Sequence, residues 1–526
     1  MRINALLIGL ALTALVGCDV KGLYGERFEI ESFARVETGL LVWFAAPDEE
    51  LVLLEPAVGA IAVKSLFKPE DGERIDRLAV GPDPGAAQEV FAFTAPIDER
   101  EIDIVNSMYL VSPAPDTAPV QFKIGTQFGG MAFHPGGRFA VLYHPPSDSE
   151  GGEGLFNQNE VAVLDLNSLP SDVDNPRLLT IGMGGRNVEG VDFPGPLNVA
   201  GVERDFVVFE ADGAIVLLDL ADPAFAPVTV KLKNEGDNRI IVPEQILVRP
   251  GDAAFDPMLI LRAPGAQEIF AVALVPRPDG EPGFVAALNQ FDSGAYQPTA
   301  MALVEDGGHP LLVVAGYGTQ SVAIIDVETA YSFYIELGGT VSALLEHVRA
   351  DGAPEVVMYG ASQWICFLAV DDLAQEKGSN LEEVFIEDGV DTAWRFGTDA
   401  LLAVPYSGYG LTLIDLTERE ATRLTSDESY SWSEAEAYGD VLFYAGSGDD
   451  RVISLDLETG HPEPLVLDEP VAAFEIFPDS GAGIVLHDTP SGRATLFTLA
   501  DPHREAAVVI DGLWLRGLLD ETEVQP

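Results

Sequence analysis

The chain has 526 residues, and its 85 Asp and Glu outnumber its 29 Lys and Arg to give a formal net charge of −56. Hydrophobic residues make up 47% of it, and Gly and Pro are frequent without a collagen-like period, which is typical of a folded chain rich in turns rather than a disordered one. Nucleic acids and anionic lipid surfaces are bound through clustered Lys and Arg, so this charge argues against both as direct electrostatic partners.

The acid excess has two interpretations. Only 7 Lys and 22 Arg accompany the abundant Asp and Glu, a balance that resembles proteins of salty environments, where charge serves solubility and self-repulsion is screened. Alternatively, the charge recruits a cationic partner or divalent ions. We favour the first interpretation.

The first residues have the features of a secretory signal. A weakly basic start is followed by an apolar stretch, Ala5 to Val16, which is too short to span a bilayer as a helix but has the length of a signal h-region. It ends in Leu15-Val16-Gly17-Cys18, which resembles the lipobox of bacterial lipoproteins. The resemblance implies that residues 1–17 are a cleaved signal peptide, that the Cys18 thiol carries a diacylglycerol, and that residues 18–26 form a linker. The competing interpretations are a plain signal peptide with a chance cysteine and a buried N-terminal helix.

A lipid at Cys18 would place the rest of the chain outside the cytoplasm. No other apolar run reaches transmembrane length, so residues 27–526 are expected to form a domain tethered to a bacterial membrane through its N-terminal lipid. The sequence leaves open whether that domain faces the periplasm or the cell surface. The other cysteine, Cys366, lies in the apolar run Ile365–Leu368 and is expected to be buried and inert.

An apolar run with an Asp near its end recurs along the chain. Runs of this length, bounded by turn residues, are typical of β-strands. The clear copies are Val161–Leu166, Ile215–Leu220, Val322–Val327, Leu411–Leu416 and Val452–Leu457. Weaker copies begin at Met108, Ile269, Ile365 and Thr495, and a tenth is Leu51–Pro56. Their spacing, about 53 residues in the first half and about 43 in the second, indicates a repeat architecture.

Each repeat is expected to hold four antiparallel strands. The clearest unit, residues 130–182, has its strands at Met131–Phe133, Phe139–Tyr143, Val161–Leu166 and Arg177–Ile181. Four strands per 40–55 residues is one propeller blade, and a blade packed between two neighbours is apolar on both faces. We therefore predict an all-β fold, a β-propeller built from about seven to ten four-stranded blades.

Two segments resemble known propeller families. Val313–Gly338 is similar to the YVTN-type repeat, and the turn His134–Arg138 resembles the HPDG-R turn of WD40-like propellers. The likeness covers most of the chain in rhythm, although a consistent Y-V-T-N tetrad is missing and the first-half loops are long. Nine or ten blades exceed the usual four to eight, so two rings with a boundary near residues 330–340, or accessory hairpins, compete with the single continuous body that we favour. Leu513–Leu515 is expected to pair with strands near Phe28–Ala34.

The polar residues favour structural roles. The repeated Asp residues are expected to accept backbone N–H bonds in the following turns rather than to form a carboxylate ring. The histidines show no metal-binding spacing and are expected in turns and at the surface, at His134, His144, His309, His347, His461, His487 and His503. No catalytic residue and no cofactor is predicted. Structural Ca²⁺ at Asp172–Asp174 or Asp449–Asp450 is the alternative to solvated turns there.

Aromatic residues cluster in the later repeats. In loops they would offer a stacking surface to a glycan or a peptide, because aromatic anchors dominate binding hot spots. Packing between blades is the competing interpretation. The candidate binding face consists of Trp394, Tyr406, Tyr409, Tyr430, Trp432 and Tyr438.

Three functions fit these features. The first is a non-enzymatic, lipid-anchored binding scaffold for a protein or cell-envelope partner outside the cytoplasm. The second is a propeller hydrolase, such as a lactonase, with acidic and His side chains holding a metal in the central channel. The third is an envelope or outer-membrane assembly factor, which rests on analogy of fold alone. We favour the scaffold.

Overall fold

The computed structural model contains ten antiparallel β-sheets and, within the part of the chain that it describes, no helix. Consequently no helix among those residues is long and apolar enough to cross a bilayer. The described residues are 29–36, 39–46, 50–69, 73–81, 90–96, 107–112, 117–124, 128–145, 159–168, 177–180, 188–211, 213–220, 226–232, 241–251, 255–278, 283–294, 297–306, 309–370, 380–396, 399–407, 409–429, 434–445, 450–457, 459–487, 493–502 and 507–510.

The chain divides into two compact units, which we describe separately. The larger unit comprises residues 128–165 and 177–427, and the smaller one comprises residues 1–127, 166–176 and 428–526. The larger unit holds six of the sheets and the smaller unit holds four.

The smaller unit contains the first two and the last two sheets of the chain. Their strands are β1 (Glu29–Val36), β2 (Gly39–Ala46), β3 (Glu50–Ala57) and β4 (Ala60–Phe67); β5 (Glu73–Val80), β6 (Val90–Pro96), β7 (Ser107–Val111) and β8 (Val120–Lys123); β34 (Glu434–Tyr438), β35 (Val441–Ala445), β36 (Arg451–Asp456) and β37 (His461–Val466); and β38 (Val471–Phe477), β39 (Ala482–His487), β40 (Arg493–Thr498) and β41 (Val508–Ile510).

The larger unit contains the six sheets between them. Their strands are β9 (Gly130–Phe133), β10 (Phe139–Tyr143), β11 (Glu160–Asp165) and β12 (Arg177–Thr180); β13 (Val188–Asp192), β14 (Pro196–Val199), β15 (Val202–Ala211), β16 (Ala214–Asp219) and β17 (Val228–Lys231); β18 (Gln245–Arg249), β19 (Met258–Arg262), β20 (Glu268–Pro276) and β21 (Phe284–Asp292); β22 (Pro298–Asp306), β23 (His309–Gly316), β24 (Ser321–Asp326) and β25 (Ser332–Glu336); β26 (Ala343–Val348), β27 (Pro354–Tyr359), β28 (Trp364–Ala369) and β29 (Leu381–Phe385); and β30 (Val390–Phe396), β31 (Ala400–Pro405), β32 (Tyr409–Asp415) and β33 (Glu420–Ser429).

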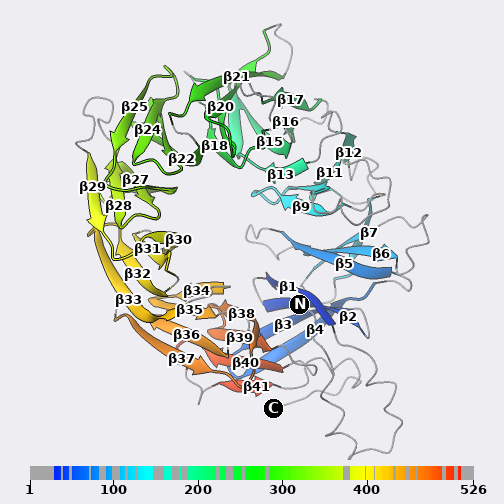
Figure 1. The fold of residues 1–526 in the computed structure, drawn as a ribbon. Coiled ribbons are helices and arrows are strands. Elements are labelled where there is room, and N and C mark those ends of the chain that lie inside the picture. Colours follow the sequence, from blue (N-terminus) through cyan, green and yellow to red (C-terminus); the bar gives the residue numbers. More distant parts are fainter. Residues whose placement is uncertain are drawn as a thin grey trace, which may run out of the picture. The chain divides into compact units, whose positions relative to one another are not determined.

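Each sheet is an antiparallel meander in which strands consecutive in the chain pair with one another (Figure 1). One sheet carries an extra short strand, β14, beside β15. The ten copies of the sequence motif are the third strands of the ten sheets: β3, β7, β11, β16, β20, β24, β28, β32, β36 and β40. The prediction of an all-β propeller of four-stranded blades is therefore confirmed, with ten blades.

Most of the third strands are deeply buried, and so are second strands such as β23 and β39. Every residue of β16 is buried, and β11, β24, β28, β36 and β40 are buried at all four central positions. The fourth strand β25 instead alternates between buried and exposed residues. In the larger unit β22 and β30 lie on the inner side of their sheets and β25, β29 and β33 on the outer side (Figure 1). A strand with neighbouring strands on both edges and neighbouring sheets on both faces reads as a continuous apolar run.

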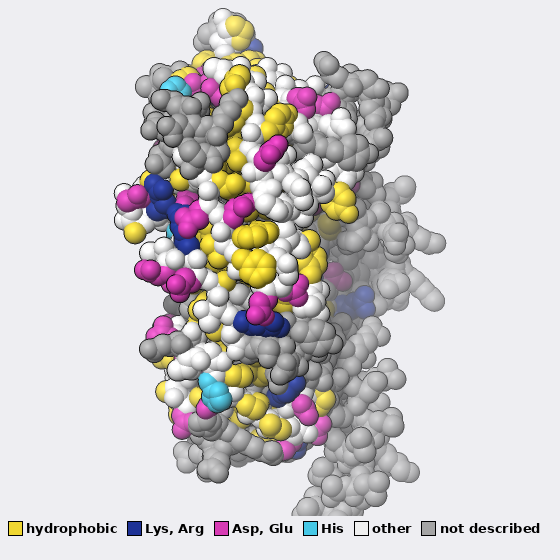
Figure 2. Space-filling model, turned by 60° about the vertical axis from the view of Figure 1, so that its left-hand side comes forward, with side chains coloured by type: hydrophobic (Ala, Val, Ile, Leu, Met, Phe, Trp, Pro, Cys, Tyr) yellow, Lys and Arg dark blue, Asp and Glu magenta, His cyan; other side chains and the backbone are white. Residues whose placement is uncertain are grey.

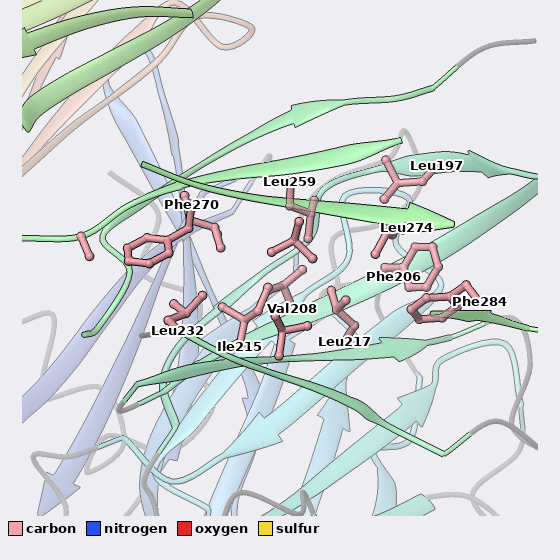
Figure 3. Close-up of a cluster of buried hydrophobic side chains, with 14 of the residues drawn as sticks. Leu197, Phe206, Val208, Ile215, Leu217, Leu232, Leu259, Phe270, Leu274 and Phe284 are labelled. Atoms are coloured by element: carbon pink, nitrogen blue, oxygen red, sulfur yellow. The ribbon is translucent and has the colours of Figure 1, made fainter. Parts of the chain in front are cut away.

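Apolar clusters fill the space between consecutive sheets. Between the β13–β17 and β18–β21 sheets, Phe206, Ile215, Leu217, Leu259 and Phe270 are fully buried (Figure 3). Comparable clusters join the other neighbouring sheets of the larger unit. Burial of apolar surface is the main favourable term in folding, so each sheet is stabilised chiefly by its neighbours rather than by itself.

The first and last sheets of the chain pack against each other in the smaller unit. Leu40, Val42 and Leu54 of the first sheet share a buried cluster with Ile484 and Leu486 of the last. Within the described residues β1 pairs only with β2, and Leu513–Leu515, the segment expected to pair near it, lies outside them. The first and last sheets therefore meet through face-to-face side-chain packing in this unit.

Candidate binding surface

Two tyrosines occupy equivalent exposed positions in the larger unit. Tyr317 directly follows β23 and is 70% exposed, and Tyr406 directly follows β31 and is 51% exposed. The backbone N–H of Tyr317 donates to the carbonyl of Gln297 at 2.8 Å, and that of Tyr406 donates to the carbonyl of Gly389 at 3.0 Å. Each acceptor belongs to the segment that leads into the first strand of the same sheet, so the two hairpins are built alike.

The sheet between these two hairpins contributes an aromatic pair at the same end. Trp364 begins β28, Phe385 ends β29, and the two face each other in the strand register with ring centroids 5.4 Å apart. Phe385 is 56% exposed, whereas Trp364 packs partly against the core between the β22–β25 and β26–β29 sheets. Figure 2 brings β25 and β29 forward and shows hydrophobic side chains gathered at mid-height on that face.

Hydrogen bonds donated by backbone N–H groups link these three sheet ends. The N–H of Val390, at the start of β30, donates to the carbonyl of Gly360 in the hairpin before β28 at 2.8 Å. On the other side, the N–H of Gly338, just after β25, donates to the carboxylate of Glu383 in β29. We call the set Tyr317, Trp364, Phe385 and Tyr406 the aromatic surface.

Acidic side chains accompany the aromatic surface. Glu336 is exposed at the end of β25, opposite Ser321 at the start of β24 and beside the Tyr317 hairpin. Asp388 is half-buried and accepts the N–H of Gly389, whose carbonyl holds the Tyr406 hairpin. Carboxylates therefore stand beside both tyrosine hairpins.

Cys366 is buried, as the sequence predicts. Its side chain is 0% exposed, and its thiol donates to the Glu383 carboxylate across 3.7 Å. Burial, with a smaller contribution from the negative charge of Glu383, raises the pKa of Cys366 to about 12. A thiol with that pKa is protonated at neutral pH and unreactive.

The structure brings together only part of the predicted aromatic face. Tyr406 and Tyr409 belong to one hairpin, because Tyr409 begins β32. Trp394 is 38% exposed and pairs with Leu402 of β31. Leu402 comes four residues before Tyr406, which is about 13 Å along the strand, so Trp394 lies away from the Tyr406 hairpin. Tyr438 ends β34 in the smaller unit, and Tyr430 and Trp432 lie outside the described residues.

Three members of the aromatic surface, Tyr317, Trp364 and Phe385, were missed by the sequence analysis. The sequence did contain a signal for Tyr317, because Tyr317 and Tyr406 both come directly after the second strand of their repeat. Aligning the second strands as well as the third strands would have paired them.

The repeated aspartates shape turns, as predicted. The carboxylate of Asp326 accepts the N–H groups of Glu328 and Thr329 at 2.9 and 3.0 Å, and that of Asp415 accepts those of Thr417 and Glu418 at 2.8 Å. Asp456 likewise accepts the N–H of Thr459 at 2.9 Å. Asp165 and Asp219 bind arginines of their own sheets instead, Arg138 and Arg204.

The expectation of a surface location is wrong for four histidines, although His134 lies in the predicted turn between β9 and β10. His134, His144, His347 and His487 are buried, whereas His309 and His461 are exposed and His503 lies outside the described residues. The His487 ring lies 3.1 Å from the carbonyl of Glu469 through Nδ1 and 2.7 Å from the Thr495 hydroxyl through Nε2. Hydrogen bonds of this kind satisfy a buried imidazole, which explains why the core tolerates it.

No metal-binding group is found within the described ranges. Among those residues, no three His, Cys, Asp or Glu side chains are placed to hold a metal ion. Asp450 is described, but Asp172, Asp174 and Asp449, the other candidates for Ca²⁺, lie outside the ranges.

A carboxylate pair lies on the β13–β17 sheet. Burial, together with the negative charge of Asp192, raises the pKa of Glu210 to about 7. Burial also raises the pKa of Asp192, although the N–H of Phe193 that its carboxylate accepts works in the opposite direction. A side chain at Gly190 would collide with the Glu210 carboxylate, so the glycine makes room for it.

A buried ion pair links the β26–β29 and β30–β33 sheets. Arg419 Nη2 lies 2.8 Å from Glu355 Oε1, and the Glu355 side chain is 0% exposed. Arg419 also pairs with Glu382, and its guanidinium lies 5.2 Å from the centre of the Phe367 ring. Burial raises the pKa of Glu355, and the charges of Arg419 and Arg349 partly oppose that shift.

No family model matches the chain, and no curated protein matches it. Solved structures are similar to it at low identity. One is described as dihydro-heme d1 dehydrogenase NirN in complex with DHE, with 14% identity, coverage of 77% of this chain and 75% of the other, and a TM-score of 0.40. A eukaryotic initiation factor gives 10% identity, coverage of 87% and 96%, and a TM-score of 0.42. BBS1N in complex with ARL6DN gives 11% identity, coverage of 61% and 84%, and a TM-score of 0.31.

Proposed function

We propose that this protein is a lipid-anchored β-propeller that acts outside the cytoplasm as a binding scaffold for a protein or cell-envelope partner. The observation that carries the binding role is the pair Tyr317 and Tyr406, which are exposed at equivalently built hairpins on a framework of sheets joined by buried apolar clusters. Exposed aromatic side chains on a rigid framework are typical anchors of binding sites.

The aromatic surface is held by the fold rather than by long loops. Both tyrosine hairpins are tied by backbone hydrogen bonds to the segment before the first strand of their own sheet, and Trp364 packs partly against the core. Side chains that are already ordered lose little conformational entropy on binding, which favours affinity. The apolar pair Trp364–Phe385, whose rings meet edge to face, adds area that a partner would bury.

The binding role is tested by cross-linking in envelope extracts. The wild-type chain is expected to give a defined cross-linked partner that the double variant Tyr317→Ser/Tyr406→Ser loses. The matched control is Tyr331→Ser, which removes a tyrosine that is 56% exposed near the opposite end of the sheet that carries Tyr317. Equal recovery of the partner by the wild type and the double variant would contradict the proposed role of the surface.

The anchoring is supported by the lipobox-like sequence that ends in Cys18. Cys18→Ser removes the thiol that would carry the lipid, so this variant is expected to leave the membrane fraction while the wild type stays in it. Metabolic labelling with a fatty-acid analogue gives the second measurement. A variant that still partitions and labels like the wild type would show that the anchor is wrong while leaving the binding role intact.

A further inference from the structure

We propose that the aromatic surface binds an extended, cationic peptide segment, one that carries Lys or Arg side chains at two positions. This inference rests on the proposed scaffold function and names the class of partner for the same surface. It is carried by the joint placement of tyrosines and carboxylates at the two hairpins.

The spacing of the two tyrosines suits an extended chain. Tyr317 and Tyr406 belong to the sheets on either side of the β26–β29 sheet, so they are two sheet spacings apart. Stacked sheets lie about 10 Å apart, which gives a span of about 20 Å. An extended peptide rises about 3.3 Å per residue, so about six residues reach from one tyrosine to the other.

Each end of that span offers a ring and a carboxylate. At one end the exposed Tyr317 is accompanied by exposed Glu336, and at the other Tyr406 is accompanied by Asp388. A guanidinium or ammonium group that stacks on a tyrosine ring while bonding to a carboxylate gains a cation–π contact and a charge-assisted hydrogen bond together. A neutral sugar can also stack on the ring and donate hydroxyl groups to the carboxylate, but it lacks the positive charge that strengthens both contacts.

The remaining charges also favour a cation. Arg423, next to the Tyr406 end, is paired with Glu387, so its charge is already matched. The chain as a whole carries a formal charge of −56, which would attract cationic segments from a distance at low ionic strength. Between the two ends, Trp364 and Phe385 provide aromatic area on which the aliphatic stems of Lys or Arg can lie.

The test measures binding of defined peptides to the detergent-solubilised full chain by fluorescence anisotropy. The probe is a fluorescein-labelled Gly/Ser peptide with two arginines six positions apart. We expect saturable binding that weakens with added NaCl, and at least about tenfold weaker binding when the arginines are replaced by glutamines. We expect Tyr317→Ser, Tyr406→Ser and Glu336→Gln each to raise Kd by about two- to fivefold. Tyr331→Ser should leave Kd unchanged.

Several results would overturn the proposal. They are equal binding of the glutamine peptide, a chitin hexasaccharide that binds more tightly than the arginine peptide, or a loss in Tyr331→Ser as large as that in Tyr317→Ser. Failure here is distinguishable from failure of the scaffold role. If cross-linking in extracts still depends on Tyr317 and Tyr406 while the cationic peptide does not bind, the scaffold stands and the partner class is wrong.

Discussion

At the scale of single residues, the β13–β17 sheet holds a carboxylate that prefers to be neutral. Burial raises the pKa of Glu210 to about 7 from its usual 4.5. Between these two values the folded protein binds more protons at this group than the unfolded chain does, so stability falls as the pH rises through that window. Because the group is partly solvated, the loss is on the order of 1–2 kcal/mol rather than the full value of the shift.

Replacing Glu210 by Gln is expected to remove this pH dependence. The variant keeps the shape of the side chain but has no charge to bury, so its melting temperature should exceed that of the wild type by a larger margin at pH 8 than at pH 5. Differential scanning calorimetry at both pH values measures the margin. Glu336→Gln, at an exposed carboxylate, is the control. Equal margins at the two pH values would show that Glu210 is not the group responsible.

A second residue-scale prediction concerns Arg419. Removing one partner of a buried ion pair leaves the other charge uncompensated, which typically costs about 3–5 kcal/mol. Arg419→Ala should therefore destabilise the protein strongly, because Glu355 is 0% exposed. Glu355→Gln in the same chain should recover part of the loss by removing the buried charge. Chemical unfolding of the wild type, of Arg419→Ala and of the double variant Arg419→Ala/Glu355→Gln measures these effects.

Arg423→Ala is the matched control for this prediction. Arg423 pairs with Glu387, whose side chain is 69% exposed, and exposed ion pairs contribute only about 0–1 kcal/mol. At acid pH the free energies of unfolding of Arg419→Ala and the wild type should also lie closer together, because protonation of Glu355 removes the uncompensated charge. A loss no greater than that of Arg423→Ala would contradict the account of the pair.

At the scale of elements, the third strands were visible in the sequence because each is apolar on both faces. All four central residues of β24 and β36 are buried, and this pattern needs no knowledge of the partners. The outer strands β25 and β37 alternate and carry polar residues, so their signal is weaker. Only Tyr406 of the aromatic surface was predicted. The other three members come to the same end of neighbouring sheets through the stacking of those sheets, which the sequence does not show.

The Asp at the end of each clear third strand gives an element-scale prediction. Asp415 accepts the N–H groups of Thr417 and Glu418, and the next residue, Arg419, adopts a positive φ of 58° in the same turn. Asp415→Ala removes the carboxylate oxygen that accepts both N–H groups, so we expect a loss of about 1–2 kcal/mol in the free energy of unfolding. Asp415→Asn retains an acceptor oxygen and should lose less.

The turn also positions Arg419 toward Glu355, so the two effects should be coupled. In a double-mutant cycle, Asp415→Ala should cost less in the Arg419→Ala background than in the wild type. Asp326→Ala provides the comparison, because its carboxylate accepts the N–H groups of Glu328 and Thr329 in a like turn where Ala330 takes the place of the arginine. Strictly additive losses for Asp415 and Arg419 would show that the turn does not position the arginine.

At the scale of the whole molecule, the smaller unit makes the first sheet depend on the last. Leu54 of β3 and Leu486 of β39 belong to one buried cluster although they are separated by most of the chain. This packing could not be predicted from the sequence, because the apolar strands resemble one another and do not specify which sheets pack together. The sequence had predicted pairing of terminal strands, whereas within the described residues the sheets meet through their faces.

This dependence predicts long-range coupling. Leu486→Ala leaves a cavity in the shared cluster, and buried Leu→Ala changes cost about 2–5 kcal/mol. Because sheets in a repeat architecture are stabilised by their neighbours, amide hydrogens of β2 and β3 should exchange at least about tenfold faster in this variant, measured by hydrogen-exchange mass spectrometry on the full chain. Leu217→Ala makes a comparable cavity in the larger unit and should leave β2 and β3 protected. Faster exchange confined to β38–β41 would mean that the last sheet does not support the first.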